Sequence, residues 1–268
     1  YRREGIFSNG EPCDFHFVTP EADVGPADLV LVAVKALQLD DALASIRHHV
    51  GKNTVILSLL NGITSEAIIG GVYGMDHVVY CVAYGMDAVR EGNRLTYRNM
   101  GKLCIGVNGG GALPENVKRV VRFFEQTDFP FEVDAHMEKR MWGKFMLNVG
   151  VNQTVALFGP DYGALQHEGE QRDTMIAAFR EVVTLSRLEG VNLTEADVQY
   201  WLQLLSTLNP GGKPSMRQDV EARRRSEVAL FAGTVLALGQ KHGVATPVNR
   251  MLYDGILKLE AGYATPSA

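Results

Sequence analysis

Two kinds of apolar pattern alternate in the first half of the chain. Continuous runs of Val, Leu and Ile, typical of strands buried on both faces, occur at 28–36, 54–62 and 78–86. Between these runs, 37–50 and 65–74 carry apolar residues at helical spacing. Because parallel strands need crossover helices, this alternation with short connections predicts a parallel α/β sheet.

Beyond residue 91 the pattern first becomes mixed and then purely helical. It predicts a hairpin over 92–107, a helix over 114–127 and a strand over 129–133. After this strand the pattern predicts helices only, over 135–159, 168–190, 194–208 and about 221–243. Gly190 and Gly243 are the expected caps of the second and fourth of these helices. The sequence therefore predicts an α/β sheet domain over 1–134, followed by an all-helical domain over 135–268.

Composition narrows the class of partner. The chain has 268 residues, of which 46% are hydrophobic, so it can bury a substantial core. A net charge of −5 without a basic block argues against nucleic acid and membrane surfaces, and favours a small molecule. The three cysteines form no C-x-x-C pair, which favours a reducing, cytoplasmic compartment. The longest apolar run, 228–239, is shorter than the ~20 residues that span a bilayer.

A nucleotide-binding α/β domain normally opens with a strand and a G-x-G-x-x-G turn. No such turn occurs here, and the nearest stretch, GVNGGG at 106–111, has the wrong spacing and predicts a surface loop. The residues before Asp28 suffice for a short extended hairpin, but not for a strand, a turn, a helix and a second strand. We therefore expect the first βαβ unit to be absent from this chain, which begins at Tyr1.

One polar row lies inside the first predicted helix of the second domain. Lys144, Asn148 and Asn152 are spaced i, i+4, i+8, which places them on one stripe among apolar neighbours. The stripe could simply face water. Alternatively it faces a cleft, where the lysine supplies a proton or polarises a carbonyl while the carboxamides hold substrate oxygens.

A carboxylate stands directly before the apolar run at 228–239. Glu227 could be partly desolvated there, which is a common trait of site residues. Its alternative is an i, i+4 surface pair with Arg223, matching a pair of Glu221 with Arg225. Periodicity does not separate the two interpretations.

Polar side chains also follow two predicted strands. Lys35 and Asn61 would lie at the carboxyl ends of adjacent parallel strands, which is where open α/β sheets bind their ligands. For Asn61, ordinary Asn-Gly turn chemistry is an alternative explanation.

Four stretches together resemble the ketopantoate reductase family, the 2-dehydropantoate 2-reductases. They are VKALQ (34–38), NGI (61–63), WGKFMLNVGVNQ (142–153) and PSMRQDVEARRRSE (214–227), and the resemblance spans essentially the whole chain. It implies NADPH-dependent reduction of 2-dehydropantoate to pantoate, in pantothenate biosynthesis. It also implies that the sheet domain is an incomplete Rossmann-like dinucleotide-binding domain and the helical domain a substrate-binding domain.

The resemblance implies a role for each matching residue. Lys144 is similar to the family's proton donor to the ketone oxygen, and Glu227 to the carboxylate between substrate and nicotinamide ribose, which serves catalysis and cofactor binding. The other implied contacts are Asn148, Asn152 and Ser215 for the substrate, and Lys35 and Asn61 for NADPH.

The chain departs from the family pattern in two places. The glycine-rich unit is missing, so we expect weak NADPH binding by these residues alone, and Gln153 stands where many members have proline. Two alternatives stay open: a reductase of another 2-keto acid, and a truncated, non-catalytic member acting through its helical domain, for instance in homodimer contacts.

Overall fold

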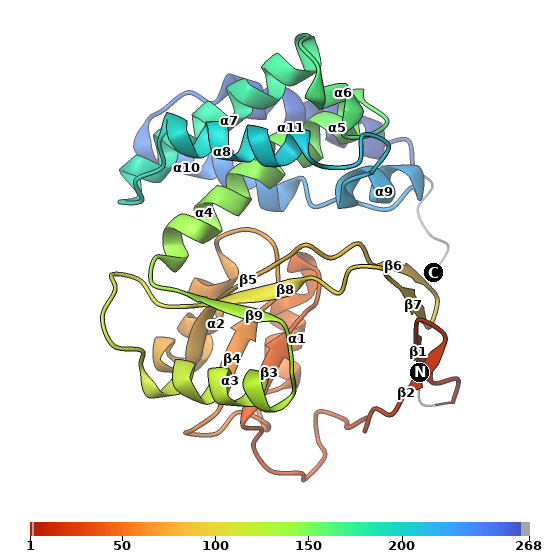
Figure 1. Cartoon of the computed structure of the whole chain (residues 1–268), viewed down its shortest axis with the longest axis vertical. Helices are drawn as coiled ribbons and strands as arrows, with labels where there is room; N and C mark the ends of the chain where they lie inside the picture. Colours follow the sequence, from red (N-terminus) through yellow and green to blue (C-terminus); the bar gives the residue numbers. More distant parts are fainter. Residues whose placement is uncertain (2, 264–268) are drawn as a thin grey trace. The chain divides into compact units, whose positions relative to one another are not determined.

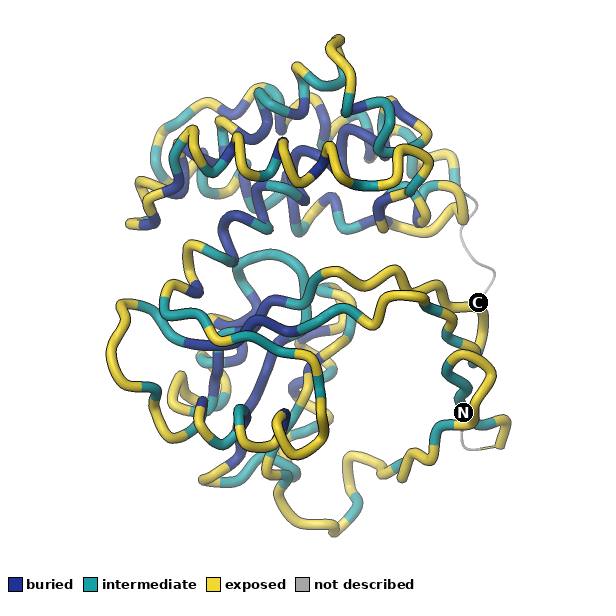
Figure 2. The backbone as a smooth tube through the Cα atoms, in the orientation of Figure 1, coloured by how far each residue is buried: buried dark blue, intermediate teal, exposed yellow. Residues whose placement is uncertain are grey.

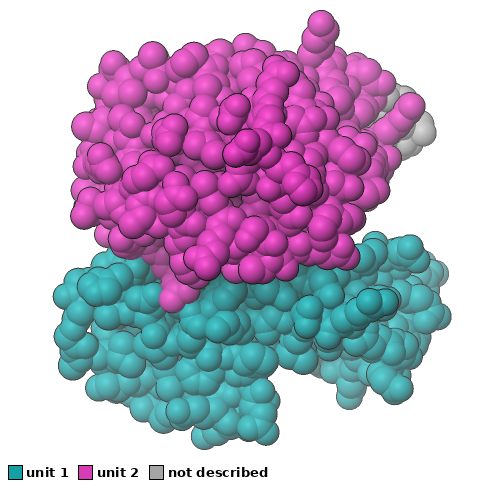
Figure 3. Space-filling model, turned by 45° about the horizontal axis from the view of Figure 1, so that its top comes forward, with its two compact units in different colours: residues 1–137 teal, residues 138–268 magenta. Residues whose placement is uncertain are grey.

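The computed structural model describes residue 1 and residues 3–263 of the chain. They form two compact units, which divide after residue 137 and are coloured separately in Figure 3. The division falls a few residues after the boundary expected from the change in apolar periodicity.

The first unit is built on a five-stranded sheet with the order β3-β4-β5-β8-β9 (Figure 1). Its strands are β3 (Leu29–Val32), β4 (Val55–Ser58), β5 (Val78–Tyr84), β8 (Lys102–Gly106) and β9 (Phe131–Asp134). β3, β4 and β5 are parallel, as the alternation of strands and helices predicts, and β8 and β9 are parallel to each other. The pair β5–β8 is antiparallel, so the sheet as a whole is mixed.

A second, small sheet corrects the predicted hairpin over 92–107. It has the order β2-β1-β7-β6, in which β7 (Arg94–Thr96) pairs with β6 (Val89–Glu91) and β1 (Ile6–Ser8). β8 belongs to the large sheet because its apolar side chains are buried there, whereas those of β6 and β7 are mostly exposed. β1 and β2 (Glu11–Cys13) form a short antiparallel hairpin, for which the residues before Asp28 are long enough.

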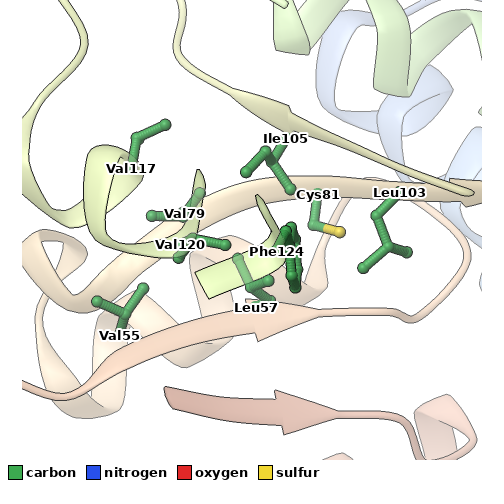
Figure 4. Close-up of a cluster of buried hydrophobic side chains, with 9 residues drawn as sticks. All are labelled: Val55, Leu57, Val79, Cys81, Leu103, Ile105, Val117, Val120 and Phe124. Atoms are coloured by element: carbon green, nitrogen blue, oxygen red, sulfur yellow. The ribbon is translucent and has the colours of Figure 1, made fainter. Parts of the chain in front are cut away.

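β4, the middle one of the three parallel strands, contributes buried side chains to both faces of the large sheet. On one face, Val55 and Leu57 of β4 join a cluster with β5, β8 and helix α3 (Glu115–Gln126), drawn in Figure 4. On the other face, Ile56 packs with residues of α1 (Leu39–Ser45) and α2 (Ser65–Tyr73). This two-sided burial accounts for the continuous apolar run of β4, since alternate residues of a strand point to opposite faces.

The second unit is helical. Two π-helical segments, η3 and η4, interrupt the α-helices; the elements are α4 (Met137–Leu147), η3 (Asn148–Asn152), α5 (Gln153–Phe158), α6 (Gly163–Gln166), α7 (Glu170–Leu188), α8 (Glu195–Ser206), α9 (Ser215–Glu221), η4 (Ala229–Gly233), α10 (Thr234–His242) and α11 (Pro247–Glu260). α7 packs against η3, α5, α8, α10 and α11, and the tube of Figure 2 shows much of this unit's interior as buried.

The helix ends agree with the sequence in most places. Gly190 and Gly243 have φ of 83° and 65° and follow α7 and α10, as predicted for caps. The helix predicted over about 221–243 is wrong in its first part, because α9 ends at Glu221 and Arg223 has a φ of 50°. Among the described residues, we find no helix with the length and apolar character needed to cross a membrane.

Candidate functional site

The polar row predicted in the second unit lies where the helix changes register. Lys144 is half-buried in the last turn of α4, and Asn148 and Asn152 are the two ends of η3. Asn148 is 9% exposed and Asn152 7%, so neither carboxamide lies on a water-facing stripe. The Asn152 Nδ2 atom donates to Asn148 Oδ1 at 3.3 Å, which joins the two side chains.

Asn148 holds a buried donor that the described residues do not satisfy. Its Nδ2 atom is inaccessible to solvent and has no hydrogen-bond partner among them. Leaving such a donor unpaired costs about 1–3 kcal/mol. A ligand oxygen would satisfy it, so the carboxamide is suited to binding a carboxylate, carbonyl or hydroxyl group.

Close packing against α7 holds η3 in place. Gly150, at its centre, leaves no room for a side chain, because a Cβ atom there would lie 2.2 Å from Cε1 of Phe179. π-helical segments are uncommon and occur frequently at functional sites. Here the segment carries both buried carboxamides of the row.

Ser215 is the first residue of α9 and is exposed. α9 packs against α5 and η3, so the serine lies on a helix adjacent to the carboxamide row. Pro214 precedes it as the N-cap residue and has an extended backbone.

Glu227 is half-buried and directly precedes the apolar run that contains η4, which packs against η3. The i, i+4 helical geometry assumed for the surface pairs is not present, because the chain leaves the helix after Glu221 and Arg223 adopts a left-handed conformation. The neighbour of Glu227 is anchored instead: Ser226 donates its N–H and its hydroxyl to Glu260 Oε1, at 2.8 and 2.5 Å. This anchor fixes the backbone on one side of Glu227.

In the first unit, Lys35 and Asn61 follow β3 and β4, which are neighbouring parallel strands. Lys35 is exposed, and its backbone N–H donates to Gln38 Oε1 at 3.3 Å. Asn61 is half-buried and precedes Gly62, whose φ of 93° makes the turn. The structure thus brings both residues to the same edge of the sheet, where open α/β sheets bind ligands.

A buried polar cluster beside Asn61 was not predicted from the sequence. The Oγ atoms of Ser58 and Ser65 are 2.7 Å apart, and Ser65 donates to Glu66 Oε2 at 3.0 Å. Ser58 also accepts the N–H of Leu60 at 3.3 Å, so the cluster supports the loop that carries Asn61. The only signal in the sequence was the presence of polar residues directly at the end of an apolar strand.

The first unit is an α/β domain with polar residues at the carboxyl ends of its strands, and the second is a helical domain with buried carboxamides. This is the layout of a two-domain oxidoreductase. The chain belongs to the ketopantoate reductase PanE/ApbA family. The profile described as "Ketopantoate reductase PanE/ApbA" matches residues 4–110, and that described as "Ketopantoate reductase PanE/ApbA C terminal" matches 136–260. This is a family of NAD(P)-dependent 2-keto acid reductases.

Similar proteins include 2-dehydropantoate 2-reductases from Vibrio cholerae and Halobacterium salinarum. The first is 26% identical over 89% of this chain and 79% of its own length, and the second 28% identical over 88% and 77%. Among solved structures, a PanE/ApbA family ketopantoate reductase from Ralstonia eutropha matches with a TM-score of 0.82 and 22% identity, covering 97% of this chain and 86% of the other. A D-mandelate dehydrogenase with NADH and anilino(oxo)acetate matches with a TM-score of 0.86 and 21% identity, covering 98% and 87%. These structural likenesses show the fold.

Proposed function

We propose that this protein reduces 2-dehydropantoate to pantoate with NADPH. The observation that carries the proposal is the unsatisfied, buried Nδ2 donor of Asn148, on the same helical row as Asn152 and Lys144. A 2-keto acid supplies several oxygen acceptors, which matches a row composed of two carboxamides and an ammonium group.

The roles within the row follow from the chemistry of each group. Asn148 Oδ1 already accepts from Asn152, so its own Nδ2 is the group available to a substrate oxygen. Lys144 supplies the proton to the ketone oxygen, and its positive charge stabilises the alkoxide that develops there. Ser215 contributes a hydroxyl to substrate binding, and Glu227 takes part in catalysis and in binding the cofactor.

The first unit binds the cofactor in this proposal. Lys35 and Asn61, at the ends of adjacent parallel strands, offer an ammonium and a carboxamide, and this donor set fits phosphate and ribose oxygens. The bound nicotinamide supplies the hydride that adds to the ketone carbon. The buried Ser58–Ser65–Glu66 cluster keeps the loop of Asn61 in shape.

A second candidate is the reduction of a different 2-keto acid, including an aromatic one. It is favoured by the likeness to the D-mandelate dehydrogenase structure, whose ligand, anilino(oxo)acetate, carries an aromatic group. A homodimer is a further part of the proposal, since a related ketopantoate reductase from Staphylococcus aureus is described as dimeric.

The proposal is tested by following NADPH oxidation with 2-dehydropantoate, phenylglyoxylate and pyruvate. We expect the highest kcat/KM with 2-dehydropantoate, and a loss of about a hundredfold in kcat for Lys144→Ala. Lys139→Ala is the matched control, because Lys139 lies on the same helix but is exposed and paired with Asp197 at 3.1 Å. An unchanged kcat in Lys144→Ala contradicts the proposed role, and a preference for phenylglyoxylate favours the second candidate.

Cofactor binding is tested separately by titrating NADPH fluorescence. Lys35→Ala is expected to raise the NADPH dissociation constant, whereas Lys52→Ala, an exposed lysine at the opposite end of the same sheet, leaves it unchanged. Equal effects of the two substitutions refute the assignment of Lys35.

A further inference from the structure

The segment after Glu227 contains a change of helical register, which leaves one backbone N–H group without an acceptor in the helix. The N–H of Phe231 donates to the carbonyl oxygen of Glu227 at 3.1 Å, which is an i to i−4 bond. Two residues later, the N–H of Gly233 donates to Val228 at 3.0 Å, which is an i to i−5 bond. The step between the two registers skips the N–H of Ala232, which is fully buried. An unpaired N–H in this position would be costly.

Gln153 accepts that skipped bond. Its Oε1 atom lies 3.0 Å from the nitrogen of Ala232. Its Nε2 atom donates to the carbonyl oxygen of Val149 at 2.7 Å and to Asn249 Oδ1 at 3.2 Å. The side chain is 0% exposed, so its donors and its acceptor are used within the helical unit. It directly follows η3, the segment that carries Asn148 and Asn152, and thus joins the two π-helical segments.

The partner of Gln153 is itself held in place. Asn249 Nδ2 donates to Glu181 Oε2 at 2.7 Å. The same carboxylate accepts the N–H groups of Val248 and Asn249 at the start of α11, at 2.8 and 3.0 Å. Since Glu181 lies on α7, the amide of Gln153 is fixed against both α7 and α11. This network gives Gln153 one defined orientation.

We propose that Gln153 is a positioning residue that selects the π register of the segment following Glu227. It thereby fixes the backbone of Glu227 relative to the carboxamide row on η3. This inference rests on the proposed function only in assigning Glu227 and the carboxamides to the reaction.

The physical reason is that the alternative register is within reach of the chain. Without the Gln153 acceptor, the N–H of Ala232 regains a partner if the helix returns to i to i−4 bonding with Val228. Removing the extra residue of the π turn rotates Glu227 about the helix axis relative to α10 by about 100°, the angle of one residue in an α-helix. Glu227 would then present its carboxylate in a different direction.

The test compares two glutamines of the helical unit. Gln153→Met keeps the length of the side chain and removes its amide. Gln166→Met is the matched control, because the Nε2 atom of Gln166 also donates to two carbonyl oxygens, those of Leu205 and Leu208, both at 2.9 Å, away from η3 and η4. Both variants lose hydrogen bonds, so a general loss of stability is common to them.

The first measurement needs no activity. Amide hydrogen exchange of a peptide covering 228–234 is expected to accelerate at least about tenfold in Gln153→Met, relative to the same peptide in Gln166→Met. Losing the acceptor destabilises the π register by about that factor, and each conversion between the π and α registers breaks the hydrogen bonds of the segment and exposes its N–H groups to exchange. Equal exchange of this peptide in the two variants overturns the proposal.

The second measurement is kinetic, at a temperature where both variants are folded. Gln153→Met is expected to lower kcat/KM for the keto acid about tenfold or more, while Gln166→Met leaves it unchanged. An unchanged kcat/KM in Gln153→Met, with Lys144→Ala inactive, overturns the positioning role and leaves the proposed function intact. If exchange accelerates in Gln153→Met but Lys144→Ala keeps full activity, the role of Gln153 in selecting the π register is supported and the proposed reductase function is refuted.

Discussion

Gly150→Ala is the substitution whose effect the packing of the helical unit defines most sharply. A Cβ atom on Gly150 would lie 2.2 and 2.4 Å from Cε1 and Cδ1 of Phe179, and 3.0 Å from the carbonyl oxygen of Met175. Carbon atoms in contact are about 3.5–4.0 Å apart, so the new methyl group requires a shift of more than an ångström. Phe179 is fully buried, and the Met175 oxygen belongs to the backbone of α7, so neither can turn into solvent.

The expected cost follows from two opposing effects. Overpacking of a close-packed core costs about 1–3 kcal/mol, and a clash this short against a buried ring and backbone belongs at the upper end. Replacing glycine by alanine in a helix returns about 1 kcal/mol. The net loss is therefore about 2 kcal/mol, or roughly 6–10 °C in the Tm of a domain of this size.

The assay is urea unfolding followed by tryptophan fluorescence. Both tryptophans of the chain, Trp142 and Trp201, belong to the helical unit, so this signal reports on that unit alone. Gly233→Ala is the control in the same unit, because its Cβ would meet Tyr253 at an ordinary 3.6 Å. A midpoint for Gly150→Ala equal to that of Gly233→Ala refutes the packing argument. Because Gly150 is the centre of η3, we also expect its substitution to raise KM for the keto acid.

Two further predictions concern polar groups of the helical unit. Asn148→Leu removes the unsatisfied donor and the 3.3 Å hydrogen bond with Asn152. We therefore expect the free energy of unfolding to stay equal or to rise by up to about 2 kcal/mol, while kcat/KM falls. A loss of stability beyond about 1 kcal/mol would contradict this expectation. Hydrogen bonds from Lys241 and His242 hold the pKa of the Glu189 carboxyl below its usual value. A lowered pKa stabilises the fold above the unfolded value of 4.5, and this contribution is lost as the pH falls through the folded pKa. The Tm difference between the wild type and Glu189→Gln should therefore be larger at neutral pH than at about pH 3, and a constant difference in thermal melts would refute the linkage.

The sequence by itself determined the alternation of parallel strands and helices from β3 to β5 and the division into a sheet unit and a helical unit. The apolar run of β4 is continuous because both faces of that strand are covered, and burial of this kind is recorded directly in the residue pattern. The same holds for the spacing of Lys144, Asn148 and Asn152 along one helix, and for the glycine caps after α7 and α10. These features depend on neighbours within a few residues, or on burial alone.

The tertiary structure alone decided which distant groups meet. The segment 92–107 contains two strands, but their separation into two sheets depends on pairing with β1 and β5, which lie elsewhere in the chain. The π register after Glu227 likewise has no signature in the apolar pattern. The N–H of Ala232 that this register leaves unpaired donates to Gln153, which is 79 residues away in the sequence. Apolar periodicity records how deeply a residue is buried, whereas a hydrogen bond between remote segments forms only once packing has brought its donor and acceptor together.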